Sequence, residues 1–360
     1  MKKIYLMIIV FIVCMKISAI NYFACPFLML NPSTSEAAMG KVAGIADISD
    51  FSPSGFSNNP AKLGAFNSIG YEYSILNHYS TKFTASTVAI SKNGIGISFP
   101  VINSDGIFGD RIVYNEFEYN SIEEDIIKSY EPKEYNTNIS IGIDVQEVLK
   151  KIHLIKNTSD YCRIFTGASL NLVINKLLPK EYIPFYYNDR IACYLNYGII
   201  AEKTFTVCKT KNPLSISAGL VLVNPTHSTI KYINTEENLP YEVNYGFSVN
   251  YSKIIEEKII LNQVINSLYS INFQYGLSDY AQSRKDYSHG VRLSFFDLLS
   301  YRISISDIDD NPKQVLSQSV GLNIDLTKQI HFNVDYTNTD YKNEQSTVSQ
   351  AGLILVYDFK

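Results

Sequence analysis

The stretch Tyr241-Glu-Val-Asn-Tyr-Gly-Phe-Ser-Val-Asn-Tyr251 decides the fold, because its apolar and polar residues alternate at every position. Successive side chains on a β-strand point to opposite faces, so this stretch has one aromatic and aliphatic face and one polar face. Its length of about ten residues is what a tilted strand needs to cross the hydrocarbon layer of a membrane. The stretch therefore predicts a membrane-crossing strand with one side toward lipid.

The same alternation recurs from residue 67 to the end of the chain, and it predicts an all-β fold. We place about fourteen strands, an even number as single-chain bacterial barrels require: 67–76, 81–91, 94–102, 136–145, 161–174, 189–201, 214–224, 241–252, 268–278, 288–296, 299–307, 316–326, 330–338 and 350–359. The predicted fold is a transmembrane antiparallel β-barrel of about 14 strands with a short N-terminal plug.

The connections between these strands support a barrel. Asn93-Gly94 is a residue pair of tight hairpin turns, whereas the connections 278–288, 308–316 and 339–349 are longer and polar. Short turns at one end and long loops at the other are typical of outer-membrane barrels. Segments 146–160 and 252–267 lie on the short-turn side, yet are long enough for small helices, so they are either insertions or slips of register.

Composition narrows the class of protein. Only 18% of the 360 residues are charged, the chain has 27 Tyr, 19 Phe and no Trp, and its formal net charge is −4. That balance offers no basic surface, so we expect no nucleic-acid partner. A soluble β-sandwich or propeller would also alternate, but its strands would be shorter and its exposed face richer in Lys and Glu.

The N-terminus predicts export. Lys2 and Lys3 precede a short apolar run and the small residue Ala19, so residues 1–19 are expected to be a cleaved signal peptide. The run is shorter than the ~20 residues of a membrane-spanning helix. Lipid attachment at Cys25 is an alternative that only Ala24 supports. We expect the mature protein in a bacterial outer membrane.

Residues 20–66 form the predicted plug segment, and residues 67–360 the barrel. The part from residue 31 onward does not alternate and is rich in Ala, Gly, Ser and Asn-Pro. Small side chains allow close backbone packing, and Asn-Pro favours a turn. Such a compact segment before the first strand is expected to fill the mouth of the barrel.

This plug segment resembles a known family. Ala38-Met39-Gly40, followed about twenty residues later by Asn59-Pro60-Ala61-x-Leu63, resembles the opening of the PorV/PorQ proteins, relatives of FadL-type fatty-acid transporters. Asn58 stands where that family usually has an aromatic residue, and Lys62 where it often has Gly. The resemblance implies a plug motif made of Met39, Gly40, Asn59, Pro60, Ala61 and Leu63.

Later stretches carry the same resemblance. They are the Gly-apolar-Asn strand of residues 217–224, the strand with Gly246 after Pro240, and the hairpins after Gly290 and Gly321. The resemblance implies a barrel of the same strand number. It also implies a non-enzymatic role in protein export, such as type IX secretion, in which the barrel binds cargo or partner proteins.

Three other functions remain open from the residues themselves. The barrel could be a FadL-like transporter of hydrophobic small molecules or fatty acids, a passive structural or adhesive barrel, or an outer-membrane enzyme. The side chains on the polar, lumen-facing side of the predicted strands are Asn, Ser, Asp and Glu rather than an apolar lining. This lining favours partner binding over a fatty-acid route. We expect outer-membrane lipid and the barrel-assembly machinery as partners, with secretion proteins or a hydrophobic ligand in addition.

The C-terminus resembles the insertion signal of outer-membrane barrels. After Gln350 it has Gly and alternating apolar residues that end in an aromatic, and the signal residues are Gly352, Leu355, Tyr357 and Phe359. Lys360 departs from the commonest form, in which the aromatic residue is last.

The remaining reactive residues predict little chemistry. The five His are far apart in the sequence and no nucleophile motif occurs, so we predict neither a catalytic site nor a cofactor. Cys162 and Cys208 both fall near the periplasmic rim, where a disulfide between them could form. Asp307, Asp309 and Asn311 have the spacing of a calcium loop, but Pro312 stands where such loops need Gly, which favours a solvated acidic loop.

Overall fold

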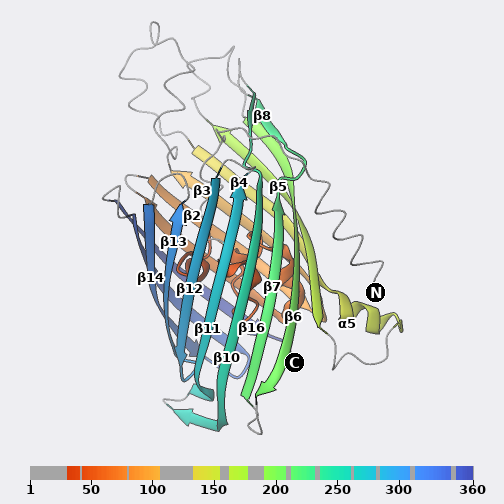
Figure 1. Cartoon of the computed structure of the whole chain (residues 1–360), viewed down its shortest axis with the longest axis vertical. Coiled ribbons are helices and arrows are strands. Elements are labelled where there is room, and N and C mark those ends of the chain that lie inside the picture. Colours follow the sequence, from red (N-terminus) through yellow and green to blue (C-terminus); the bar gives the residue numbers. More distant parts are fainter. Residues whose placement is uncertain are drawn as a thin grey trace, which may run out of the picture.

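The chain forms a closed barrel of fourteen antiparallel strands (Figure 1). The structure is a computed structural model, and it describes residues 31–40, 43–78, 81–105, 133–154, 162–176, 190–207, 212–231, 236–260, 263–280, 284–308, 313–341 and 346–359. The signal peptide predicted for residues 1–19 lies outside the described residues. The barrel confirms the all-β fold class predicted from the alternation.

Each strand pairs with its neighbour in the sequence, except that β7 pairs with β10 and β1 with β16, which closes the barrel. The barrel strands are β1 Ser68–His78, β2 Thr81–Lys92, β3 Ile95–Asp105, β4 Lys133–Asp144, β5 Arg163–Lys176, β6 Arg190–Val207, β7 Asn212–Val223, β10 Glu242–Ile260, β11 Gln263–Tyr280, β12 Arg284–Phe295, β13 Leu299–Ile308, β14 Lys313–Asp325, β15 Ile330–Tyr341 and β16 Ser346–Asp358. The short strands β8 Thr229–Lys231 and β9 Glu236–Asn238 form a separate small sheet between β7 and β10.

The outer face of the barrel is apolar. Large hydrophobic side chains are exposed along the strands, among them Phe99, Phe247, Phe273 and Leu355, with Phe273 55% exposed. Water would disfavour a continuous apolar surface of this extent, whereas the hydrocarbon layer of a membrane favours it. The alternation in the sequence therefore separates a lipid-facing side from a lumen-facing side.

The two ends of the barrel differ. Short turns join β2 to β3 and β12 to β13, and the first of them contains Asn93 and Gly94 with φ of 55° and 80°. The C-terminus lies toward this end, and the β8–β9 sheet lies at the opposite end (Figure 1). By the pattern of outer-membrane barrels, the short-turn end faces the periplasm and the loop end faces outward.

The two long connections predicted on the short-turn side differ in structure: the first contains a helix, and the second consists mostly of strand. Within 146–160 the expected helix is present as α5 Val145–Lys151, whose N-cap Asp144 accepts a hydrogen bond from the Glu147 backbone N–H. For 252–267 the second alternative holds: the strands expected to end at 252 and to begin at 268 are longer than predicted, because β10 continues to Ile260 and β11 begins at Gln263. No helix among the described residues is long and apolar enough to cross a membrane.

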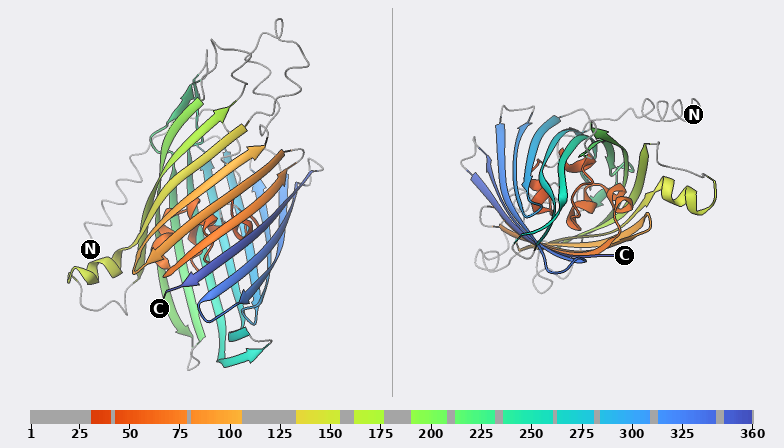
Figure 2. Two further views of the ribbon diagram at one scale, coloured as in Figure 1. Left: turned by 180° about the vertical axis from the view of Figure 1, so that it is seen from behind. Right: turned by 90° about the horizontal axis from the view of Figure 1, so that it is seen from below.

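The segment before β1 lies inside the barrel, as the view along the barrel shows (Figure 2). Its described residues form α2 Thr34–Ala37 and three short 3₁₀ helices, η2 Ala43–Ala46, η3 Ser54–Ser57 and η4 Pro60–Ala65. Asn59 is the N-cap of η4, and Pro60 follows at the first helical position, where its missing N–H costs no hydrogen bond. We call residues 31–66 the plug from here on.

Candidate functional site

A row of glycines in the barrel wall receives one side of the plug. Gly96, Gly142, Gly167 and Gly198 lie opposite one another on β3, β4, β5 and β6. A Cβ atom on Gly142 would lie 2.6 Å from Leu63 Cβ, and one on Gly167 would lie 2.6 Å from the Ala61 backbone nitrogen. Any larger residue in this row would displace η4, so the four glycines form a seat for the plug.

Further glycines receive the remaining side of the plug. Gly219 and Gly246 lie opposite each other on β7 and β10, and both face the backbone of Ala46. Gly290 on β12 faces Met39, where an added Cβ would lie 2.8 Å from the Met39 carbonyl oxygen. We call the two sets of glycines together the glycine seat.

The predicted plug-motif residues lie at these contacts. Asn59 donates a hydrogen bond from Nδ2 to the Ile45 carbonyl at 2.9 Å, which joins η4 to η2. Ala61 packs with Phe165 and Ile200 of the wall, and Leu63 packs with Phe56 of η3. Met39 and Gly40 lie against β12, and Gly40 has a φ of 80° that favours glycine. The structure therefore brings all six motif residues into the plug's own packing or its contact with the wall.

The two departures from the family pattern share one partner. Lys62 forms an ion pair with Glu36, and Asn58 donates a hydrogen bond to the same carboxylate at 2.6 Å. The Lys62 side chain is only 3% exposed, so the pair is buried within the plug. The sequence marked Asn58 and Lys62 as unusual, but nothing in it pointed to Glu36 as the residue that joins them.

Acidic and basic side chains also fix the plug to the wall. Asp50 of the plug forms ion pairs with Arg292 of β12 and, at 3.4 Å, with Arg302 of β13. Arg302 also contacts Asp335 of β15 at 2.6 Å. Loss of water around Asp50 alone would raise the pKa of its carboxyl, but the two guanidinium groups hold the pKa below its ordinary value of 3.8.

A few residues after Asp50, the plug also binds the wall at Glu72 of β1, which accepts hydrogen bonds from Ser52 Oγ at 2.9 Å and from the Ser54 backbone N–H at 2.8 Å. Sequence analysis missed Arg292, Arg302 and Glu72. The signal was present, because each is a charged residue on the polar side of an alternating strand, where it can only face the lumen.

An apolar cluster lies above the plug, toward the loop end of the barrel. It combines lumen-facing residues from the upper ends of the strands with two residues of the connection between β7 and β10, and it consists of Leu76, Phe83, Val173, Ala192, Tyr194, Ile230, Leu239 and Val348. Each member is at most 8% exposed. We call this the mouth cluster. This apolar cluster differs from the lumen-facing Asn, Ser, Asp and Glu side chains predicted from the sequence. Those polar side chains were the reason for favouring partner binding over a fatty-acid route.

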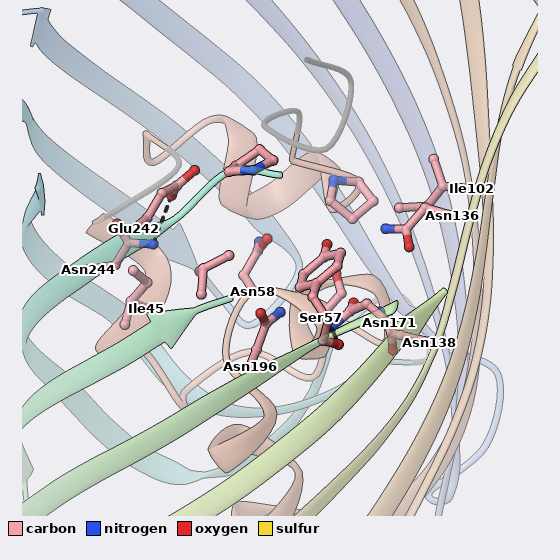
Figure 3. Close-up of a pocket in the computed structure, with 14 residues that line it drawn as sticks. Ile45, Ser57, Asn58, Ile102, Asn136, Asn138, Asn171, Asn196, Glu242 and Asn244 are labelled. Carbon is pink, nitrogen blue, oxygen red and sulfur yellow. Dashed lines mark hydrogen bonds between the residues drawn. The ribbon is translucent and has the colours of Figure 1, made fainter. Parts of the chain in front are cut away.

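A cavity of about 50 Å³ lies between the plug and the mouth cluster (Figure 3). Tyr194 and Val223 line this cavity and also take part in, or pack against, the mouth cluster. Its walls otherwise come from the plug and from strands β3, β4, β5, β6 and β10, with the lining residues Pro32, Ile45, Ser57, Asn58, Ile102, Asn136, Asn138, Asn171, Asn196, Pro240, Glu242 and Asn244.

The C-terminal signal residues belong to β16 and the residue that follows it. Gly352 faces Thr34 of the plug, whereas Leu355 and Tyr357 are exposed on the outer face. The Phe359 backbone N–H donates to the Asn67 carbonyl at 3.0 Å, which holds the chain end beside the start of β1. The role of these residues in insertion stays a prediction.

The predicted disulfide and calcium loop fall partly on undescribed residues. Cys162 is an exposed, free cysteine in the structure, and Cys208 lies outside the described residues. Asp307 lies in β13, whereas Asp309 and Asn311 also lie outside them. In the described part of the chain, no group of three or more His, Cys, Asp or Glu is placed to hold a metal ion.

Comparisons with known proteins add little beyond the fold. No protein-family model matches the chain, and no curated protein matches it. Solved structures that resemble it include a monoaromatic hydrocarbon channel, CymD (10% identity, 94% of this chain and 99% of that chain, TM-score 0.44). A Pseudomonas aeruginosa FadL homologue (8%, 91% and 98%, TM-score 0.44) and the Ralstonia pickettii toluene transporter TbuX (10%, 93% and 100%, TM-score 0.42) are similar to the same degree.

Likeness this weak carries no argument about function, and the barrel rests on its own strand pairing. None of these comparisons shows the resemblance to PorV/PorQ. The class defined by the fold and the apolar outer face is an antiparallel transmembrane β-barrel of fourteen strands with a plug in its lumen.

Proposed function

We propose that this protein is a plug-gated transporter of the bacterial outer membrane that takes small molecules with an apolar part, a FadL-like role. The observation that carries the proposal is the mouth cluster, a set of buried apolar side chains inside the loop end of the barrel. A lumen that needed only to hold water or polar solutes would gain nothing from Phe83, Val173 and Leu239 at its entrance.

The seated plug supports gating rather than open diffusion. It lies inside the barrel (Figure 2) and is held by the glycine seat and by the ion pairs of Asp50. A solute therefore reaches the periplasmic side only when part of the plug moves. The plug contacts the wall through polar groups, Arg292, Arg302 and Glu72, and through close packing on the glycine seat.

The wall beside the cavity contains a local break in strand pairing. The β3–β4 ladder is interrupted: Ser98 pairs with Ser140 and Val101 with Thr137, and no pairing joins the residues between them. Pro100, which lacks a backbone N–H, lies in this interruption. Ile102, Asn136 and Asn138 beside it line the cavity.

Protein export, implied by the PorV/PorQ resemblance, is the second candidate. It would act through the external loops, and the long ones, 106–132 and 177–189, lie outside the described residues. No described feature favours it over transport, so we rank it second.

Uptake in cells tests the transport proposal. The full chain is expressed in a bacterium that lacks its own hydrophobic-uptake barrels, and entry of radiolabelled oleate and of toluene is compared with entry of a disaccharide. We expect several-fold faster entry of the apolar probes than with empty vector. Leu239→Asn should reduce that gain, whereas Leu154→Asn, at an exposed position beside α5, should not. Uptake of every apolar probe at the empty-vector rate would overturn the proposal.

A further inference from the structure

The acidic loop of the plug, residues 47–50, lies against hydrogen-bond donors from three neighbouring strands. Asn272 of β11, Arg292 of β12 and Arg302 of β13 lie directly opposite one another in the strand register. Gln274 is two residues from Asn272 and therefore on the same face of β11. All four residues are buried, with at most 5% of each exposed. We call these four residues the donor group.

Two guanidinium groups of the donor group converge on a single oxygen atom of the plug. Asp50 Oδ2 forms ion pairs with Arg292 and, at 3.4 Å, with Arg302. The Nε atoms of both arginines are buried and have no hydrogen-bond partner. The Asp50 carboxylate therefore does not use all the donors that the two guanidinium groups carry.

A second carboxylate of the plug is bound beside the first. Asp47 accepts hydrogen bonds from Gln274 Nε2 at 2.6 Å and from Asn272 Nδ2 at 3.2 Å. Its Oδ2 atom also lies 3.7 Å from Arg292. Every member of the donor group thus faces a carboxylate oxygen, which is the arrangement of an anion-binding site.

The charges at this contact make it depend on an anion. Among the described residues, ion pairs join the two arginines to three carboxylates, those of Asp47, Asp50 and Asp335. Departure of the plug loop removes the first two and leaves two cations beside the single carboxylate of Asp335. Like charges directly opposite each other on neighbouring strands repel, and a buried charge needs a partner. A state in which the loop has left the wall is therefore stabilised by another anion beside the arginines.

Solvent already reaches the edge of this contact. The Asp50 side chain is 40% exposed, and Ser49 before it is also exposed. The side chains of Arg292 and Arg302, in contrast, are only 6% and 5% exposed. A small dissolved anion can therefore reach the Asp50 carboxylate before the plug moves, and it can compete for the arginines as that carboxylate leaves them.

We infer that the donor group is an anion-binding site that Asp47 and Asp50 occupy while the plug is seated, and that a compact oxyanion such as phosphate competes for it and releases the plug loop from the wall. Phosphate fits because its oxygens match the fork of donors that arginine presents. The inference follows from the attachment of the plug alone, so it does not depend on which molecule the barrel transports.

Phosphate binding by the purified full-length protein tests the inference. Equilibrium dialysis with radiolabelled phosphate in detergent, at an ionic strength held constant with chloride, compares wild type with Asp50→Ala. Because Asp50→Ala removes the competing carboxylate, its phosphate affinity should be about tenfold higher than that of wild type. The control Asp340→Ala, which removes a carboxylate of β15 near the loop end, should bind phosphate as wild type does. Equal affinities in Asp50→Ala and wild type would overturn the inference.

A double variant locates the site. Adding Arg292→Gln to Asp50→Ala removes one guanidinium group, whereas Arg302 keeps its ion pair with Asp335 at 2.6 Å. The double variant should lose the gain in phosphate affinity, and a gain that persists would mean that phosphate binds elsewhere. Heat-dependent gel mobility checks that each variant folds, and Asp50→Asn replaces Asp50→Ala where the latter does not.

Protease cleavage within residues 31–66 tests the release of the plug. Wild type in saturating phosphate should be cleaved several-fold faster than in chloride of equal ionic strength, whereas Asp50→Ala should be cleaved rapidly in both. Equal cleavage of wild type in the two salts would overturn the release step.

Butyl phosphate identifies the source of the anion. Tighter binding of butyl phosphate than of phosphate would show that the site takes the head of a larger molecule, and equal binding would show that it takes the free ion. Failure of the binding or cleavage experiment leaves the proposed transport function in place, because uptake of apolar probes does not measure anion binding.

Discussion

Gly167 of β5 and Pro60 of the plug lie so close that a Cβ atom on Gly167 would be 2.5 Å from the Pro60 carbonyl carbon. The two residues are far apart in the sequence, and their contact depends on the register that places Gly142, Gly167 and Gly198 side by side. The glycines of the wall, which leave room for the plug backbone, therefore position the plug as much as the plug's own residues do.

Gly167→Val should loosen or displace the plug. Its side chain would overlap the backbone of η4, and overpacking of this kind typically costs about 1–3 kcal/mol. We expect faster protease cleavage within residues 31–66 and a lower midpoint of heat unfolding in detergent.

The matched control for this change is Ala168→Val, one residue further along β5. Successive side chains alternate between faces, so this position points away from the lumen. A plug equally resistant to protease in Gly167→Val and Ala168→Val would show that the glycine seat does not hold it.

Asp50→Asn should weaken the attachment of the plug to β12 and β13. The change removes the carboxylate that Arg292 and Arg302 share, after which Arg302 keeps its ion pair with Asp335 and Arg292 keeps the longer one with Asp47, at 3.7 Å. Breaking a fully buried pair costs about 3–5 kcal/mol, and because Asp50 is 40% exposed we expect about 1–3 kcal/mol.

The measurement is the free energy of unfolding in a folding-competent detergent, with Asp340→Asn, on β15 near the loop end, as the control. Equal effects of the two substitutions would contradict the role given to Asp50. Faster plug cleavage in Asp50→Asn alone would support it.

The stabilisation from Asp50 should persist into mildly acidic solution. The pKa of its carboxyl is lowered in the folded protein, so the stabilisation is fully present above the ordinary value of 3.8 and is lost as the pH falls through the lowered folded-state pKa. We therefore expect the difference in unfolding free energy between wild type and Asp50→Asn to stay constant from about pH 8 to about pH 5. A difference that already shrinks in that range would mean that another group holds the plug.

The barrel could be predicted from the sequence because each strand carries its own alternation, as in residues 241–251. The prediction failed after Ser252, where Lys253, Glu256 and Glu257 interrupt the alternation although the chain stays extended. Strand ends that project beyond the membrane have no lipid-facing side, so hydropathy no longer marks them.

The candidate site was only partly predictable for a related reason. The small residues of the plug are visible in the sequence, but their partners depend on register and closure, which no local pattern fixes. Asp50 and Arg292 are 242 positions apart. Asn136 and Asn196 come near Asn171 because their cross-strand partners on β5, Val173 and Ser169, are each two residues from it.

Cys162 provides a test of topology and of the predicted disulfide. It lies between α5 and β5 on the short-turn side, exposed and free in the structure. With a free thiol, a membrane-impermeant maleimide should label Cys162 in vesicles that expose the periplasmic face, and not in intact cells. The comparison is Cys162→Ser, in which that labelling disappears. If Cys162 is instead bonded to Cys208, its labelling requires prior reduction, and the two peptides appear linked in a non-reducing digest. Because Cys193 is also exposed and free, the label is located by peptide mapping. Labelling of Cys162 itself in intact cells would reverse the orientation assigned to the barrel.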